Sequence, residues 1–387
     1  MSEAREILFA RPWITDEDRQ AVLEVLNGHI LTHGPQGKAF EEEFAAFLGS
    51  GAHCVSVSSC MAALHLAYLH YGIGRGDEVI VPAQTHTATA HAVEWVGARP
   101  IFVDCDPRTG NLTADSIAKA ITPRTKAISV VHFVGIPCAM PEIAALAERH
   151  GLKLIEDCAI ALGSRYEGRH VGLFGDAGCF SFYPVKHLTT GEGGMFVSRH
   201  APVAEKVAKL RAFGVDRKHS ERSIPGMYDV PALGLNYRMS EMAAALGRSQ
   251  LRRLERNLAI RKENFARLKN GLAAAPNLQI LDSEGNGVVS SHYCLSVVLE
   301  GRPTEVRNRL VTKLNLAGVG TSVYYPQPVP RLAYYRNKYG YDRQACCSAE
   351  VISDRSIALP VGPHLTGADI DHVAQTFVRI VKEETNV

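Results

Sequence analysis

The order of short apolar segments and longer helical ones constrains the fold of this chain more than any other feature. Residues 55–58 are short and β-prone, and residues 61–71 repeat apolar side chains at helical spacing. The alternation continues with strand-like segments at residues 78–81, 100–103, 127–131 and 153–157 and helical segments at residues 87–96, 114–121 and 140–150. It is typical of right-handed βαβ units and predicts an α/β fold, with a mostly parallel sheet covered by helices.

The pattern changes after residue 240. Residues 240–272 are rich in Ala, Leu, Arg and Glu and predict one or two long helices that lead out of the first unit. Further segments follow, with strand-like character at residues 293–300 and 320–323 and helical character at residues 303–316 and 367–383. We therefore predict a large α/β domain over residues 1–255 and a smaller C-terminal α+β domain over residues 256–387.

Composition narrows the class of protein. The chain has 387 residues, 46% of them hydrophobic, and a formal net charge of +2, so nothing favours nucleic acid as a partner. No apolar run is long enough to span a membrane, and the first residues lack the apolar core of a secretory signal. The nine cysteines show no CxxC spacing, and no HExxH motif is present. We expect a cytoplasmic protein with reduced thiols and no metal site.

A lysine stands where the chain should carry chemistry. Lys186 lies between the apolar, strand-like residues 179–183 and the glycine-rich turn at residues 191–194. Ligands of α/β proteins bind at the carboxyl ends of strands, and an amine with a lowered pKa can form a Schiff base with an aldehyde there. A lysine on a loop is more often simply solvated, so this residue needs support from others.

Three other strand ends supply that support. Ser58, Ser59, Cys60 and Met61 join a strand to a helix, where backbone N–H groups can hold a phosphate. His86 follows the second strand and offers a flat ring, and Asp157 ends another strand with a carboxylate. Each has a plainer interpretation, as an ordinary junction, a polar loop residue or a structural salt bridge. Together they describe a site for pyridoxal 5′-phosphate (PLP), because they supply a phosphate cradle, a stacking ring, a pyridinium partner and an amine.

Several motifs also resemble one known family. They lie at residues 34–35, 58–65, 76–82, 103–106, 121–127, 155–159, 180–186, 191–194 and 235–239. Across nearly the whole chain, they are similar to those of the DegT/DnrJ group of nucleotide-sugar aminotransferases. The resemblance implies the fold-type I aminotransferase architecture, a homodimer with shared active sites, PLP with pyridoxamine phosphate (PMP) as its intermediate form, and L-glutamate as the amino donor.

The resemblance also implies roles for single residues. Lys186 matches the lysine that binds the cofactor and shuttles the proton, and Asp157 matches the partner of the pyridine nitrogen. Ser181 and Asn236 match phosphate contacts, the latter from the other subunit, and His86 stands where an aromatic ring usually stacks. Two further positions depart from the pattern: Cys60-Met61 replaces a common Gly-Thr, and Ile160 replaces a polar residue.

These observations predict an aminotransferase that moves an amino group to a nucleotide-linked keto sugar, for a surface polysaccharide or a secondary metabolite. Two alternatives stay open: a PLP- or PMP-dependent sugar dehydratase, in whose class histidine replaces the lysine, and a non-catalytic regulator on the same fold. Candidate substrate contacts are the basic residues of one loop and two tyrosines after residues 320–323. A solvated loop and ordinary packing of the tyrosines would explain the same residues equally well. These candidates are Arg217, Lys218, His219, Tyr324 and Tyr325.

Overall fold

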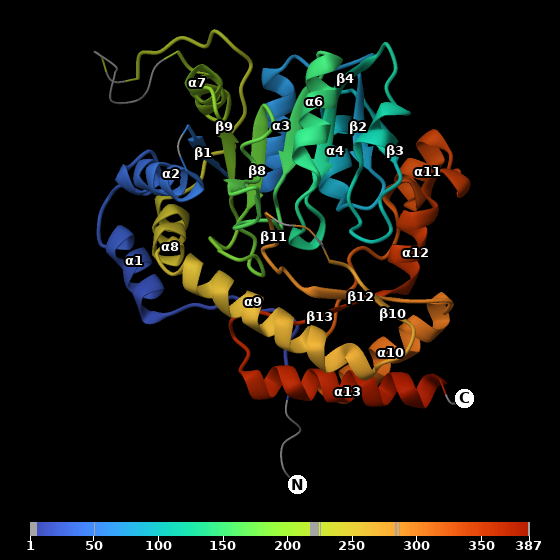
Figure 1. Cartoon of the computed structure of the whole chain (residues 1–387). Coiled ribbons are helices and arrows are strands. Elements are labelled where there is room, and N and C mark those ends of the chain that lie inside the picture. The colour runs from blue at the N-terminus through green and yellow to red at the C-terminus, as the bar shows by residue number, and fades with distance from the viewer. Residues whose placement is uncertain are drawn as a thin grey trace.

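The structure is a computed structural model that describes residues 6–49, 51–216, 224, 226–282, 285 and 287–385. A seven-stranded sheet forms the upper layer in Figure 1, and a three-stranded sheet with two long helices forms the lower layer. The strand order of the large sheet is β1-β9-β8-β5-β4-β2-β3. Its strands are β1 (His53–Val57), β2 (Glu78–Pro82), β3 (Arg99–Val103), β4 (Thr125–Val131), β5 (Lys153–Asp157), β8 (Ala177–Ser181) and β9 (Gly194–Ser198).

Parallel pairing dominates the large sheet, as the alternation predicted. β2 pairs in parallel with β3 and β4, β4 with β5, and β5 with β8. β9 runs antiparallel to both of its neighbours, β1 and β8. The α/β fold class is therefore confirmed, with one reversed strand that the sequence pattern did not reveal. The carboxyl ends of the six parallel strands lie at one edge of the sheet.

Helices cover both faces of this sheet, because successive strand residues point to opposite sides. Val79 and Val81 pack with α3 on one face, whereas Ile80 packs with α5 and α6 on the other. Phe40 and Phe44 of α2 extend the second face over β8 and β9. The covering helices are α2 (Pro35–Leu48), α3 (Cys60–His70), α4 (Thr87–Trp95), α5 (Ala114–Ala118), α6 (Met140–Arg149), α7 (Ala201–Leu210) and α8 (Glu241–Leu251), with α1 (Asp16–Leu26) against α8.

The lower layer has a core of its own. The antiparallel strands β10 (Leu278–Ile280), β12 (Leu295–Leu299) and β13 (Ser356–Leu359) pack against α9 (Leu254–Gly271), α10 (Thr304–Leu316) and α13 (Gly367–Thr385). α11 (Ala333–Tyr339) and α12 (Cys347–Arg355) complete the C-terminal part. The predicted boundary near residue 255 falls at the start of α9 and stays a prediction. Ile7 from the N-terminal segment also packs into this second core.

Two sequence expectations need correction in this region. Residues 320–323 form no strand, since only Ser322 makes a bridge, to Ala358 of β13. β12 is shorter than the predicted residues 293–300 because Tyr293 and Cys294 turn into the contact between the two layers. A small antiparallel sheet not foreseen from the sequence joins β6 (Arg165–Tyr166), β7 (Arg169–His170) and β11 (Val288–Val289).

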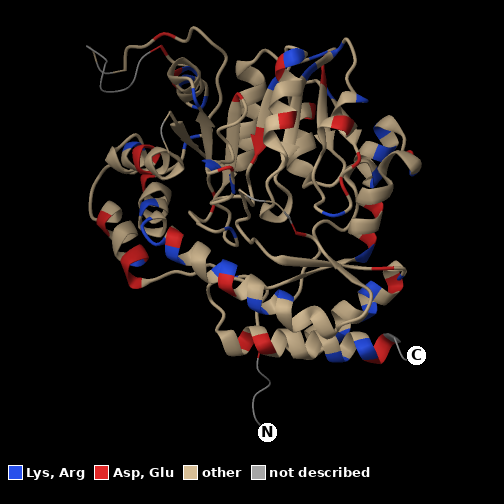
Figure 2. Ribbon diagram, in the orientation of Figure 1, with Lys and Arg blue, Asp and Glu red and all other residues tan. Residues whose placement is uncertain are grey.

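Charged residues lie mainly on the helices and loops in Figure 2. Glu156 and Asp157 at the end of β5 are exceptions, with exposed fractions of 0% and 5%. Buried carboxylates must be paired or hydrogen-bonded, so both point to specific surroundings. Among the described residues, no helix is both long and apolar enough to cross a membrane.

Candidate active site

Asp157 is held at the carboxyl end of β5, facing α3 and α4. The Thr89 hydroxyl donates to Asp157 Oδ2 at 2.8 Å, and the backbone N–H of Ala159 donates to Oδ1 at 3.0 Å. The Cys60 thiol lies 3.7 Å from the same Oδ1. In the described part of the chain no cationic side chain forms an ion pair with this carboxylate. A protonated ring nitrogen would supply the missing positive charge.

Lys186 lies on the turn that follows β8. Its amine is 5.0 Å from the centre of the Tyr293 ring. Burial lowers the pKa of Lys186 below its ordinary value, while the Cys60 thiol and the Asp157 carboxylate act in the opposite direction. Within the described ranges the amine has no salt bridge to a carboxylate. A lysine in this setting gives up its proton more readily than one in water, as a nucleophile or base must.

The N-terminus of α3 lies next to these groups. Ser59 caps the helix by accepting a hydrogen bond from the N–H of Ala62 at 3.1 Å. β9 begins so close that a Cβ on Gly194 would lie 2.6 Å from the Cys60 nitrogen. The helix N-terminus can bind a phosphate through backbone N–H groups. Cys60 does not direct its thiol to such a phosphate, because that thiol also contacts the Cys179 carbonyl, at 3.3 Å.

Aromatic side chains surround His86. Its Nδ1 accepts a hydrogen bond from the N–H of Ala88 at 3.1 Å, which caps α4. Tyr325 meets the His86 ring edge-on at 5.5 Å, and Tyr324 shares a hydroxyl hydrogen bond of 2.9 Å with Tyr293. Burial lowers the pKa of His86, so a neutral imidazole faces the site near neutral pH. Tyr293, Tyr324 and Tyr325 belong to the C-terminal part of the chain. Their rings form an aromatic wall that faces the carboxyl ends of the parallel strands.

The structure brings together several of the predicted site residues. Four of them lie close together: Lys186, Asp157, Cys60 and His86. The charges of Asp157 and Lys186 act on the pKa of His86, and the Cys60 thiol contacts Asp157 directly. The predicted Ser181 is partly buried at the end of β8, where its hydroxyl lies 3.4 Å from the N–H of Tyr183.

Three further positions that the sequence singled out, Met61, Ile160 and Asn236, lie outside this group. Met61 packs with the core under α3, and Ile160 is buried, with 2% of its side chain exposed. Asn236 is exposed and forms a bridge to Ala212 rather than a contact with the group around Lys186. Arg217, Lys218 and His219 lie outside the described residues.

Sequence reasoning missed Thr89 and Tyr293. Thr89 is in the first turn of α4, three residues after His86, and its position near a strand end was the available signal. Tyr293 carried no such signal, because only the docking of the lower layer places its ring against Lys186.

The donor set fits PLP. An amine, a carboxylate without an ionic partner among the described residues, and a helix N-terminus meet beside an aromatic wall at the carboxyl ends of parallel strands. PLP carries an aldehyde, a basic ring nitrogen and a phosphate, one for each of these groups. Asp157 would hold the ring nitrogen, Lys186 the aldehyde and the start of α3 the phosphate.

Comparisons with known proteins agree with this interpretation. The chain is 37% identical to the spore coat polysaccharide biosynthesis protein SpsC of Bacillus subtilis over 378 residues, 97% of each chain. Spr1654 of Streptococcus pneumoniae, solved in a PMP form, has a TM-score of 0.92 at 29% identity, with 97% of this chain and 99% of that chain covered. Helicobacter pylori PseC, an aminotransferase of pseudoaminic acid biosynthesis, has a TM-score of 0.91 at 27% identity, with 98% and 100% covered.

Fold and site thus define a PLP-dependent aminotransferase of fold type I. Residues 12–378 match the model of the DegT/DnrJ/EryC1/StrS aminotransferase family, and the chain belongs to that family.

Proposed function

We propose that this enzyme transfers the amino group of L-glutamate to a keto sugar linked to a nucleotide, in the biosynthesis of an amino sugar. The observation that carries the proposal is Lys186, a partly buried amine of lowered pKa near the Asp157 carboxylate. The names of SpsC and PseC place those relatives in polysaccharide and pseudoaminic acid biosynthesis, which supports a sugar as the acceptor.

Bound PLP supplies an electron sink for the electron pair that remains when a Cα–H bond breaks. Asp157 keeps the ring nitrogen protonated, because separating a buried carboxylate from its cation costs several kcal/mol. Lys186 would accept the Cα proton and deliver it to the carbon of the cofactor's aldehyde group, on the far side of the amino nitrogen, and a positioned base of this kind is worth about 10²–10⁴-fold in rate. His86 would flank the ring, and Ser181 and the N-terminal N–H groups of α3 would hold the phosphate.

We place the sugar against the tyrosines of the lower layer. Tyr324 and Tyr325 are partly buried and close to both His86 and Tyr293. Their rings and hydroxyls offer an apolar face and hydrogen bonds, a combination that suits a sugar. The basic residues Arg217, Lys218 and His219 stay predicted contacts of the nucleotide phosphates.

The working form in this proposal is a cytoplasmic homodimer. Asn236 is exposed, and apolar side chains near it in the chain are exposed as well. Phe213, Met227, Tyr228, Val230 and Leu233 have exposed fractions of 49%, 63%, 52%, 50% and 94%. Such a concentration of exposed apolar residues marks an interaction surface. A second copy that covers it would receive Asn236 at its own phosphate site.

The dehydratase alternative is less favoured by the residues next to the lysine. His187 follows Lys186 but is buried, and its Nε2 lies 3.2 Å from the Ser291 carbonyl. Burial lowers the pKa of His187 far below its ordinary value. His187 is therefore buried in the contact between the two layers. Lys186, and not His187, can act as a base in the site. A purely regulatory role would leave the lowered pKa of Lys186 without a use.

The test combines a substrate panel with one variant. Purified enzyme is given L-glutamate and a set of nucleotide-linked keto sugars, and formation of 2-oxoglutarate and amino sugar is measured. Lys186→Ala should lose the absorbance of lysine-bound cofactor and at least about 10²–10⁴-fold in rate. Survival of both signals in this variant, or failure of every keto sugar with the wild type, would contradict the proposal.

A further inference from the structure

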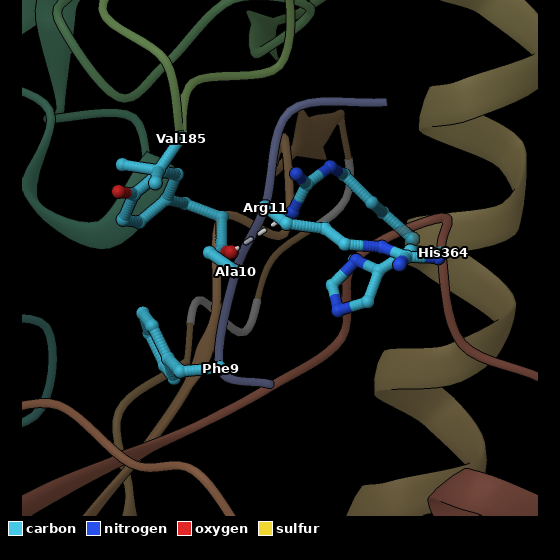
Figure 3. Close-up of a pocket in the computed structure, with 8 residues that line it drawn as sticks. Phe9, Ala10, Arg11, Val185 and His364 are labelled. Carbon is cyan, nitrogen blue, oxygen red and sulfur yellow. Dashed lines mark hydrogen bonds between the residues drawn. The ribbon is translucent and has the colours of Figure 1, made fainter. Parts of the chain in front are cut away.

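A small pocket lies beside Lys186, on the side of the lower layer. Val185, the neighbour of Lys186, forms one wall, and residues of the N-terminal segment and of the loop after β13 form the others (Figure 3). The residues that line it are Phe9, Ala10, Arg11, Val185, Arg261, Tyr293, Gly362 and His364. Neither the candidate cofactor contacts nor the proposed sugar contacts include the basic residues of this pocket.

Arg261 of α9 is the unusual member of the lining. Only 6% of it is exposed, and one of its terminal nitrogens donates to the Tyr293 carbonyl at 3.0 Å. Its Nε is buried without a hydrogen-bond partner, and no carboxylate of the described residues forms an ion pair with it. Burial lowers the pKa of Arg261 to about 10, so it remains charged at neutral pH. A buried cation without an anion is costly.

Two other basic residues, Arg11 and His364, also line the pocket, and none of the described residues that line it is acidic. Figure 3 shows Arg11 and His364 side by side. The pKa of His364 is lowered, first by burial and then by the charges of Arg11 and Arg261, while Asp369 and a contact with the Leu8 carbonyl act against that shift. Two guanidinium groups therefore direct positive charge to one small space. An anionic group is the natural complement of such a space.

The position of the pocket indicates which anion it takes. Tyr293 links the two sites, because its carbonyl accepts from Arg261 while its ring lies 5.0 Å from the Lys186 amine. An α-amino acid whose nitrogen reacts at Lys186 carries its carboxylates a few bonds away. The pocket is also small. A planar carboxylate suits a guanidinium fork in such a space better than a nucleoside diphosphate does.

We propose that Arg261, with Arg11 at the exposed side, binds a carboxylate of the amino donor. This rests on the proposed function for the identity of the donor, but the pocket can be tested without turnover. Glutarate serves as the probe, because it has the two carboxylates of glutamate and no amine to react.

Binding of glutarate to the PLP-loaded enzyme is measured by titration calorimetry, together with KM and kcat for glutamate. Arg261→Gln should weaken glutarate binding and raise the KM for glutamate by about tenfold or more, as expected for loss of a charge-assisted hydrogen bond. Arg11→Gln should give a smaller weakening, about threefold, because its side chain is exposed. Arg256→Gln, an exposed arginine of the same helix outside the pocket lining, is the matched control and should change neither value.

Unchanged glutarate binding in Arg261→Gln would overturn the proposal. If Arg261→Gln does not fold, the proposal is tested with Arg11→Gln instead. Glutarate binding at the wild-type level in Arg11→Gln would then overturn it. If glutarate binding depends on Arg261 but no keto sugar accepts an amine, the proposed function fails while the carboxylate site stands.

Discussion

Glu156 and Asp157 are neighbours at the end of β5, yet they face opposite sides of the large sheet and meet opposite surroundings. Glu156 accepts hydrogen bonds from the N–H groups of Gly172, Phe174 and Gly175 at 2.7, 2.8 and 2.7 Å. Asp157 has two side-chain donors and one backbone donor, and it faces Lys186 and the start of α3. Both carboxylates are buried, but their roles differ. Glu156 holds a loop through backbone N–H groups, whereas Asp157 is available to bind a ligand.

The Glu156 side also contains a group that could suggest a metal. His132, Glu156 and Cys158 place potential ligand atoms within 4.8 Å of one another. The His132 Nε2 already lies 3.1 Å from Glu156 Oε2, however, and the three N–H groups occupy the remaining acceptor positions. The backbone and the imidazole satisfy this carboxylate, so we interpret the group as structural.

Within the comparison of these two carboxylates, the largest effect on activity should come from Asp157→Asn. The neutral amide cannot form an ion pair with a protonated ring nitrogen, and breaking a buried charge pair costs about 3–5 kcal/mol, or roughly 10²–10⁴-fold in kcat/KM. Steady-state kinetics with glutamate measure this loss. The melting temperature should fall less than in Glu156→Gln, because Asp157 accepts one backbone N–H bond whereas Glu156 accepts three. A variant with wild-type kcat/KM would remove Asp157 from the cofactor site.

Glu156→Gln should reverse that result. An amide in place of the carboxylate faces backbone donors with its own N–H groups, and losing such charge-assisted bonds costs about 1.5–3 kcal/mol each. Urea unfolding should therefore show a lower free energy of unfolding, while kcat per folded molecule stays close to the wild-type value. A large loss of kcat without loss of stability would contradict the distinction between the two carboxylates.

The pH dependence of stability sharpens the same variant. Burial raises the pKa of Glu156, but His132 and the backbone donors outweigh it, so the folded pKa lies below the ordinary value of 4.5. The charge of Glu156 therefore stabilises the fold above about pH 4.5, and this contribution is lost as the pH falls through the lower folded pKa. Stability of Glu156→Gln, measured from pH 7 down to pH 3, should fall less steeply than that of the wild type.

The smallest effect is expected from Thr89→Val. The change keeps the shape but removes the hydroxyl that donates to Asp157 at 2.8 Å. One hydrogen bond to a charged group is worth about 1.5–3 kcal/mol, and the neighbouring donors compensate in part, so kcat/KM should fall about tenfold. Thr85→Val is the control, because that hydroxyl contacts Thr89 and not Asp157. Equal losses in both variants would indicate general damage to the start of α4 and the segment before it.

Much of the fold could be predicted because it depends on local pattern. The apolar segment that became β5 and the helix that became α6 were both visible as buried and amphipathic periodicity. β9 was not recognised, because a five-residue strand after a glycine-rich turn gives no sign of its direction. The strand expected at residues 320–323 was wrong for a similar reason, since its residues satisfy their backbone through single contacts with other segments.

The candidate site divides in the same way. Lys186 and Asp157 follow strands, so their proximity could be predicted from the general geometry of parallel sheets. The backbone N–H of Cys60 stays a predicted phosphate contact, and its thiol contacts the carboxylate of Asp157, which the sequence did not indicate. Tyr293 and Arg261 could not be placed, because they reach the site only through the docking of the lower layer. Residues brought together by tertiary packing carry no mark in a single sequence.

The reversed strand β9 also affects how the chain folds as it is made. β1 stands at the edge of the large sheet, and β9 is its neighbour in that sheet. During synthesis β1 emerges early, yet its hydrogen-bonding partner (Gly194–Ser198) follows only after β2, β3, β4, β5 and β8. At roughly 5–20 residues per second this delay is on the order of ten seconds. During that time β1 lacks its hydrogen-bonding partner in the nascent chain. We expect chaperones to bind the unpaired edge of this strand.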